Sequence, residues 1–156
     1  MGVSTDGKIC FGILFDEGFE FPWDNEDYDG IEEWWLSVNN YKQPFDLYDE
    51  HGEYIIIDGK EPPKDRIDEH YAHRREFFKK HPLPVEKVDY CSDGCPMYII
   101  AIPKTVMRAH RGYPVAFKPE DLVVSDDVVK ALCDFCKEHN IEYKDQPQWY
   151  LCSYWG

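Results

Sequence analysis

Apolar runs along the chain predict the strands of one sheet. Residues 9–15 hold no charged side chain, so 8–15 (K-I-C-F-G-I-L-F) is typical of a strand buried on both faces. The chain ends on 148–155, which is aromatic on both faces, and we expect this segment to lie beside 8–15. Asp93-Gly94 separates two further runs and favours a hairpin between them. The other strand-like runs are 53–58, 85–90, 97–102 and 113–117.

Three segments carry the 3.6-residue spacing of amphipathic helices. Residues 30–40 place apolar side chains at i, i+3, i+4 and i+7, namely Ile31, Trp34, Trp35 and Val38. The other two segments are 65–80 and 126–139, the latter preceded by Ser125 as a helix cap. Together these elements predict an α+β fold. We expect a single mixed or antiparallel sheet of about five or six strands with three helices, in one domain over residues 1–156.

Charge is spread unevenly along the 156 residues, whose formal net charge is −14. Residues 1–63 hold 16 acids against three lysines, which gives −13, whereas residues 64–156 hold 15 acids against 14 bases, which gives −1. A field of this sign repels nucleic acid and anionic lipid and favours basic partners. We therefore expect no direct nucleic-acid contact and no membrane contact. No apolar run approaches the roughly 20 residues of a membrane span, and the start of the chain lacks the pattern of a signal peptide, so we expect a cytoplasmic location. A homodimer is an open alternative.

The most acidic stretch is D-N-E-D-Y-D-G-I-E-E-W-W, residues 24–35. Asp29 and Glu32 suit the start of the helix that follows, which leaves Asp24, Glu26, Asp27 and Glu33 without a predicted structural role. Carboxylates on such a segment can stand where phosphates would on DNA, with Trp23 as an aromatic anchor. The partner-binding residues predicted from this segment are Trp23, Asp24, Glu26, Asp27, Asp29, Glu32 and Glu33.

Two cysteine pairs offer a second interpretation, a zinc site. The four residues are Cys91, Cys95, Cys133 and Cys136, and paired thiolates on tight turns are typical zinc ligands. Cys133 and Cys136 fall within the predicted helix 126–139, on its apolar stripe, where burial in the core is the stronger expectation. No metal and no cofactor is thus the primary prediction, and zinc is the alternative.

Basic and aromatic residues leave a third interpretation, an aromatic-lined site for nucleotide signals. Arg74 and Arg75 lie on the predicted helix 65–80, and Arg111 lies in a loop; any of the three could bind phosphate. No spacing of nucleophile, base and orienting group is typical of a catalytic site, so we expect a protein that is not an enzyme.

The two ends of the chain resemble a group of small phage-encoded accessory proteins. The opening M-G-V-S-T-D-G-K-I-C-F-G is similar to their Met-Gly start and Ser/Thr-Asp-Gly turn, and Q-W-Y-L-C-S-Y-W-G to their aromatic end. The resemblance implies a product acting in the bacterial host cytoplasm. Small acidic products of such genes often inhibit host defence nucleases of the CRISPR or restriction type. We therefore expect a DNA mimic that binds the basic site of a nucleic-acid-handling defence protein.

Overall fold

A computed structural model describes residues 5–49, 51–56, 59–92 and 94–155. Internal packing divides the chain into two compact units, residues 1–31 with 84–156 and residues 32–83, and each is described by itself. The described residues form three helices and one five-stranded mixed sheet, which confirms the predicted α+β fold. The prediction that 1–156 is a single domain stays a prediction.

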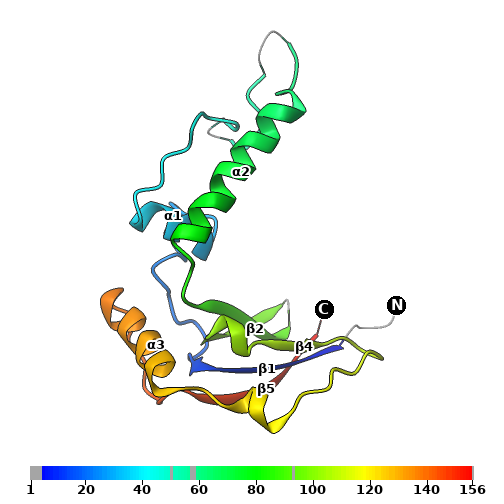
Figure 1. The fold of residues 1–156 in the computed structure, drawn as a ribbon, viewed down its shortest axis with the longest axis vertical. Helices are drawn as coiled ribbons and strands as arrows, with labels where there is room; N and C mark the ends of the chain where they lie inside the picture. Colours follow the sequence, from blue (N-terminus) through cyan, green and yellow to red (C-terminus); the bar gives the residue numbers. More distant parts are fainter. Residues whose placement is uncertain (1–4, 50, 57–58, 93, 156) are drawn as a thin grey trace. The chain divides into compact units, whose positions relative to one another are not determined.

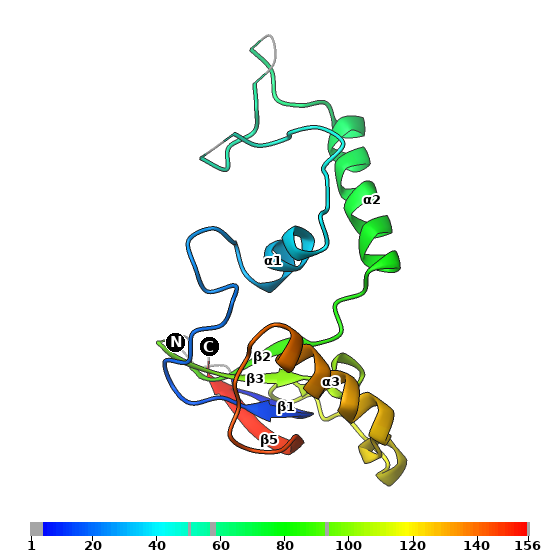
Figure 2. The same cartoon turned by 90° about the vertical axis from the view of Figure 1, so that its left-hand side faces the viewer.

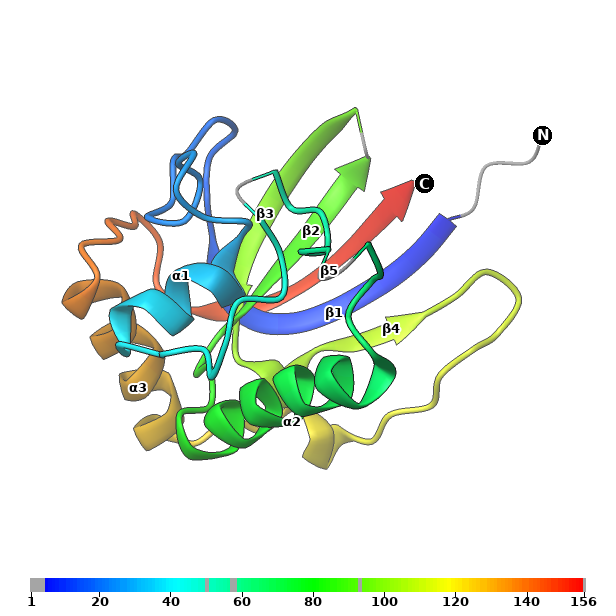
Figure 3. The ribbon, with the colours of Figure 1, turned by 90° about the horizontal axis from the view of Figure 1, so that it is seen from above.

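The sheet belongs entirely to the first unit and follows the order β3-β2-β5-β1-β4 (Figure 3). Its strands are β1 (Thr5–Leu14), β2 (Glu86–Ser92), β3 (Cys95–Ala101), β4 (Met107–Ala109) and β5 (Gln148–Trp155). β1 runs antiparallel to β5 from Thr5↔Trp155 to Gly12↔Gln148, as predicted for the two ends of the chain. β2 and β3 form the predicted hairpin, and β2 meets β5 in parallel at Cys91↔Tyr154.

An additional pairing joins β3 to the end of β1, so the strands β1, β5, β2 and β3 form a closed ring of neighbours. Side chains on the inner face of this ring pack around Cys10, Val88, Ile99 and Ala101. Gly12 sits where β1 crosses β3, and a Cβ there would lie 2.3 Å from the Ile100 carbonyl oxygen. A glycine is therefore required for the ring to close.

Helix α3 (Asp126–Glu138) lies beside the end of the sheet where β1 ends and β5 begins (Figures 1 and 3). Ser125 precedes the helix with extended backbone angles, and its hydroxyl bonds to Asp127 and lowers the pKa of that carboxyl. The apolar stripe predicted from the sequence is buried at Leu132, Phe135 and Cys136. The segment leading into β5 thus packs against α3.

The second unit contains α1 (Ile31–Val38) from Glu32 onward, α2 (Lys64–Lys80) and the long connection between them (Figure 2). Trp34 is buried as predicted, whereas Val38 is 41% exposed and Leu36 fills the core in its place. The indole N–H of Trp35 donates to the carbonyl oxygen of His81, just beyond α2, at 2.9 Å. This bond fixes α1 against the end of α2.

Within the described residues, neither 53–56 nor 113–117 forms a strand. Residues 53–56 make only an isolated bridge, between Tyr48 and Tyr54. The backbone N–H of Ile55 donates to the nearby Leu47 carbonyl oxygen at 3.0 Å and not to a strand of the sheet. Residues 57–58 lie outside the described residues. The run 113–117 is exposed and irregular, and the sheet takes β4 from the residues before it instead. Apolar, β-branched composition alone did not separate these segments from strands.

Candidate functional site

Four aromatic side chains hold the acidic segment that follows β1. Phe15, Phe19 and Phe21 form a triangle with ring centroids 4.6–4.9 Å apart, and Trp23 stacks on Phe21 at 4.9 Å. Tyr98 of β3 contacts the edge of this cluster at 6.2 Å from Phe21. The rings anchor the segment to the sheet, so the acids between them are displayed on a packed support.

The acids of this segment alternate with the rings and face solvent. Asp16, Glu17 and Glu20 are exposed, and Glu26, Asp27 and Asp29 continue the exposed series. Local hydrogen bonds shape the turn: the Asn25 side-chain oxygen accepts the Asp27 backbone N–H at 3.0 Å. This arrangement keeps the negative charge at the surface, above the buried aromatic cluster.

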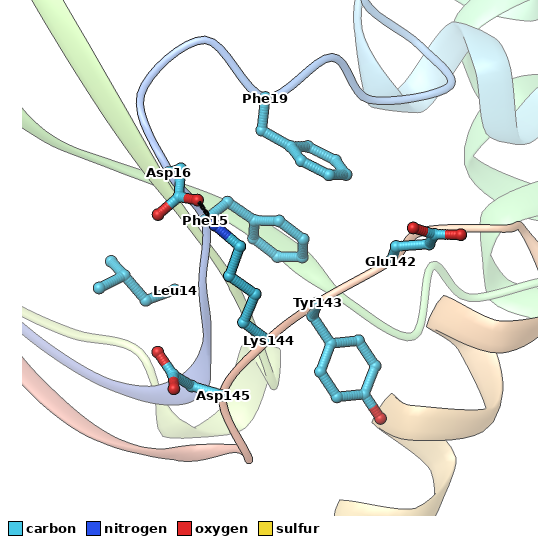
Figure 4. Close-up of a pocket in the computed structure, with 8 residues that line it drawn as sticks. All are labelled: Leu14, Phe15, Asp16, Phe19, Glu142, Tyr143, Lys144 and Asp145. Carbon is cyan, nitrogen blue, oxygen red and sulfur yellow. Dashed lines mark hydrogen bonds and ion pairs between the residues drawn. The ribbon is translucent and has the colours of Figure 1, made fainter.

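A pocket of about 230 Å³ opens beside this segment, where the end of β1 meets the chain leading into β5 (Figure 4). The antiparallel register brings the two together, because Gly12 pairs with Gln148 and residues beyond them diverge into neighbouring loops. The lining residues are Leu14, Phe15, Asp16, Phe19, Glu142, Tyr143, Lys144 and Asp145. We call this the acidic pocket.

The acidic pocket carries three carboxylates and one ammonium group. The Lys144 ammonium donates to the Asp16 carboxylate, and Figure 4 shows the lysine chain extended across the pocket toward it. That hydrogen bond raises the pKa of Lys144 above its ordinary value. Glu142 and Asp145 remain exposed, so the pocket keeps an excess of negative charge around a cation that it already holds.

Aromatic rings complete the cation-binding character of this pocket. Phe15 is only 3% exposed and Phe19 is half-buried, and both line the pocket (Figure 4). An aromatic face next to carboxylates favours ammonium or guanidinium groups. Tyr143 also lines the pocket. Its hydrogen bond with Cys133 of α3 and, to a smaller extent, its burial raise the pKa of Tyr143 to about 12, so its hydroxyl is neutral at physiological pH.

Two of the residues predicted to bind a partner have structural roles. Trp23 is 1% exposed, so the prediction that it serves as a surface anchor is wrong. It fills the aromatic cluster because an indole so close to Phe21 gains more from packing than from exposure. Asp24 accepts the backbone N–H of Phe21 at 3.0 Å and pairs with Lys87 at 3.2 Å, so it is not a spare charge.

The remaining predicted acids separate into two groups. Glu26, Asp27 and Asp29 are exposed on the first unit, in keeping with a role in binding. Glu32 and Glu33 belong to the second unit, where both bond to Arg74, at 3.2 Å for Glu32. The expectation that Glu33 has no structural role is therefore wrong, because its carboxylate neutralises a guanidinium on α2.

The four cysteines of the zinc interpretation lie on three elements, β2, β3 and α3. Cys91 and Cys95 are exposed on the β2–β3 hairpin, and the Cys95 thiol donates to Glu17 at 3.5 Å. Cys136 is fully buried in α3, and burial raises its pKa to about 12, as expected for a core thiol. Within the described part of the chain, no group of three His, Cys, Asp or Glu side chains is placed to hold a metal ion.

The pocket residues on the β5 side were missed from the sequence, namely Glu142, Tyr143, Lys144 and Asp145. A signal for them existed in the predicted pairing of 148–155 with 8–15. If that pairing is antiparallel, the residues before 148 must lie beside those after 14, which is the start of the acidic segment.

Comparisons of the chain with protein-family models, with curated proteins and with solved structures found no match. Among the residues that the structure describes, no helix has the length and apolar character needed to cross a membrane.

Proposed function

We propose that this protein is a non-enzymatic binding protein whose acidic pocket and exposed acids take up basic side chains of a partner protein. The observation that carries the proposal is the ion pair between Asp16 and Lys144 inside a pocket with two further carboxylates and aromatic walls. A lysine or arginine of the partner would meet the same groups. Glu26, Asp27 and Asp29 extend the negative surface along the same segment.

The partner class follows from the resemblance of the chain ends to phage accessory proteins. We propose a host defence protein of the CRISPR or restriction type, bound at the basic site that would otherwise contact nucleic acid. The net charge of −14 supports this choice, because carboxylates displayed on a packed support compete with phosphates for Lys and Arg. The protein would act in the cytoplasm of the bacterial host.

Charge reversal tests the pocket and the partner separately. The test variant carries Asp16→Lys, Glu142→Lys and Asp145→Lys, and the matched control carries Glu61→Lys, Asp68→Lys and Glu69→Lys, three exposed acids of the second unit. Both variants change the net charge equally. An arginine-rich peptide, titrated by calorimetry, should bind the test variant at least about tenfold more weakly than the control. Equal losses in both variants would mean that only net charge matters.

Nuclease inhibition is the second measurement. The wild-type protein, in molar excess, should slow DNA cleavage by a purified guide-loaded CRISPR nuclease or a restriction nuclease, and the test variant should not. If the peptide result holds but no nuclease of the panel is inhibited, the pocket stands and the defence-protein assignment fails.

A further inference from the structure

A second candidate site lies on the other unit, along one face of α2. A groove of about 730 Å³ follows this face, lined by Glu32, Tyr71, Arg74, Arg75, Phe78 and Lys79. The five α2 residues lie at i, i+3, i+4, i+7 and i+8, so they form a single stripe of the helix. This α2 groove shares no residue with the acidic pocket.

The α2 groove alternates aromatic rings and cations. Tyr71 is 39% exposed, and Phe78 is half-buried with the Arg74 guanidinium 5.7 Å from its ring centroid. Arg75 and Lys79 are exposed, and residues 71–81 hold four basic residues against the single acid Glu76. This half of α2 is therefore locally positive in a chain whose net charge is −14.

Arg74 and Arg75 differ in their availability. Glu32 and Glu33 hold the Arg74 guanidinium, and these carboxylates raise the pKa of Arg74 even though burial acts in the opposite direction. Arg75 takes part in none of the ion pairs within the described ranges. Lys79 pairs with Glu76 across one turn, with both side chains at least 60% exposed, and such an exposed pair costs little to break. Arg75 and Lys79 are thus the two basic side chains of the groove that can bind an anion.

We propose that the α2 groove binds a nucleotide, with the base stacked on Tyr71 and Phe78 and the phosphate held by Arg75 and Lys79. Aromatic faces accept any planar base, and a guanidinium beside an ammonium matches a phosphate group. The overall negative charge disfavours a long polyanion, so the ligand is a mononucleotide rather than a nucleic-acid strand. This site is independent of the proposed binding of a basic protein.

Calorimetric titration of the full chain with AMP, adenosine and inorganic phosphate separates the two halves of the site. AMP should bind at least about tenfold more tightly than either fragment. Tyr71→Ala should weaken AMP binding by about tenfold through lost stacking, and Arg75→Ala should weaken it similarly through the lost phosphate contact. Lys64→Ala on the first turn of α2 and Arg111→Ala on the other unit are the matched charge controls and should leave the affinity unchanged.

Glu32 gives a readout that a purely structural role would not produce. Its carboxylate lines the groove and repels a phosphate, so Glu32→Gln should tighten AMP binding several-fold while Glu33 still holds Arg74. A ten-nucleotide oligothymidylate is the competing ligand. If it binds more tightly than AMP, with the same dependence on Tyr71 and Arg75, the groove binds single-stranded nucleic acid and the mononucleotide assignment is wrong. No binding of AMP at several millimolar, or binding indifferent to these substitutions, would overturn the site.

Discussion

Lys144 places its ammonium group on the carboxylate of Asp16, a residue 128 positions earlier in the chain. The pair sits in the acidic pocket with both side chains largely exposed, at 82% and 71%. Because water screens such a pair, it contributes little to stability. In the proposed function the pair affects binding, because Lys144 occupies the carboxylate that we propose binds a cation of the partner.

Lys144→Ala should therefore strengthen the binding of an arginine-rich peptide, by a few-fold, because Asp16 no longer has an internal cation to exchange. Lys137→Ala removes the same charge from the exposed end of α3 and is the matched control. Calorimetric titration of both variants measures the difference. Equal strengthening in the two would show that only net charge had changed, and weaker binding of Lys144→Ala would show that Lys144 supports the site.

Gly12 is expected to be the position of β1 least tolerant of a side chain. A Cβ there would meet backbone and side-chain atoms of β3 at 2.3–2.9 Å, and backbone cannot move aside without opening the ring of strands. Gly12→Ala should lower the free energy of unfolding by about 2 kcal/mol. Gly7, in the same strand, has only the Ala109 carbonyl oxygen at 4.0 Å, so Gly7→Ala should change it by no more than about 0.5 kcal/mol.

Urea unfolding followed by tryptophan fluorescence compares the two variants directly. A similar loss in both would mean that the cost arises from the loss of glycine in a strand and not from the crossing of β1 and β3.

The sequence allowed the sheet and the helices to be predicted where apolar spacing was long and regular. β1, β5 and α3 each follow from such runs, and so does the placement of β5 beside β1. β4 has only three residues and no pattern that distinguishes it from a loop. The closure of β3 onto β1 rests on Gly12, whose need for close backbone approach appears only when the partner strand is known.

The acidic site was only partly predictable for a related reason. Counting carboxylates locates the segment, but the count cannot tell Asp24, which pairs with Lys87, from Asp27, which remains exposed. The burial of Trp23 was not predicted, because the sequence alone does not distinguish a tryptophan exposed for binding from one buried in the core. Which charge is paired depends on contacts between residues far apart in sequence, and the sequence alone does not show these contacts.

Cys95 should react with alkylating reagents less readily than an ordinary exposed thiol. Its hydrogen bond to Glu17, and then the charge of that carboxylate, raises its pKa. Glu17→Gln removes the charge, so the alkylation of Cys95 by iodoacetamide should shift to lower pH and become several-fold faster near neutrality. Peptide mass spectrometry measures the rate at Cys95, and Glu20→Gln, an exposed acid of the same segment, is the control. An unchanged pH profile in Glu17→Gln would show that the thiol does not use this carboxylate in solution.

Alkaline pH should destabilise the first unit through its two buried thiols. Burial raises the pKa of Cys10 and of Cys136 from 9.0 to about 12. Because the folded state holds these protons more tightly than the unfolded state, the stabilisation is complete below pH 9 and is lost as the pH rises toward 12. Between these limits each thiol contributes a fall of about 1.4 kcal/mol per pH unit.

The measurement is the urea midpoint from neutral pH to above pH 10 for the wild type and for a Cys10→Ala, Cys136→Ala variant. The double variant loses packing at every pH, but its midpoint should fall less steeply above pH 9 because two titrating groups are gone. Val88→Ala is the matched control, since Val88 is also fully buried in the core beside Cys10 and does not titrate. It should lower the midpoint and keep the wild-type slope. Parallel curves for all three proteins would show that the alkaline loss of stability arises from other groups, the tyrosines with raised pKa among them.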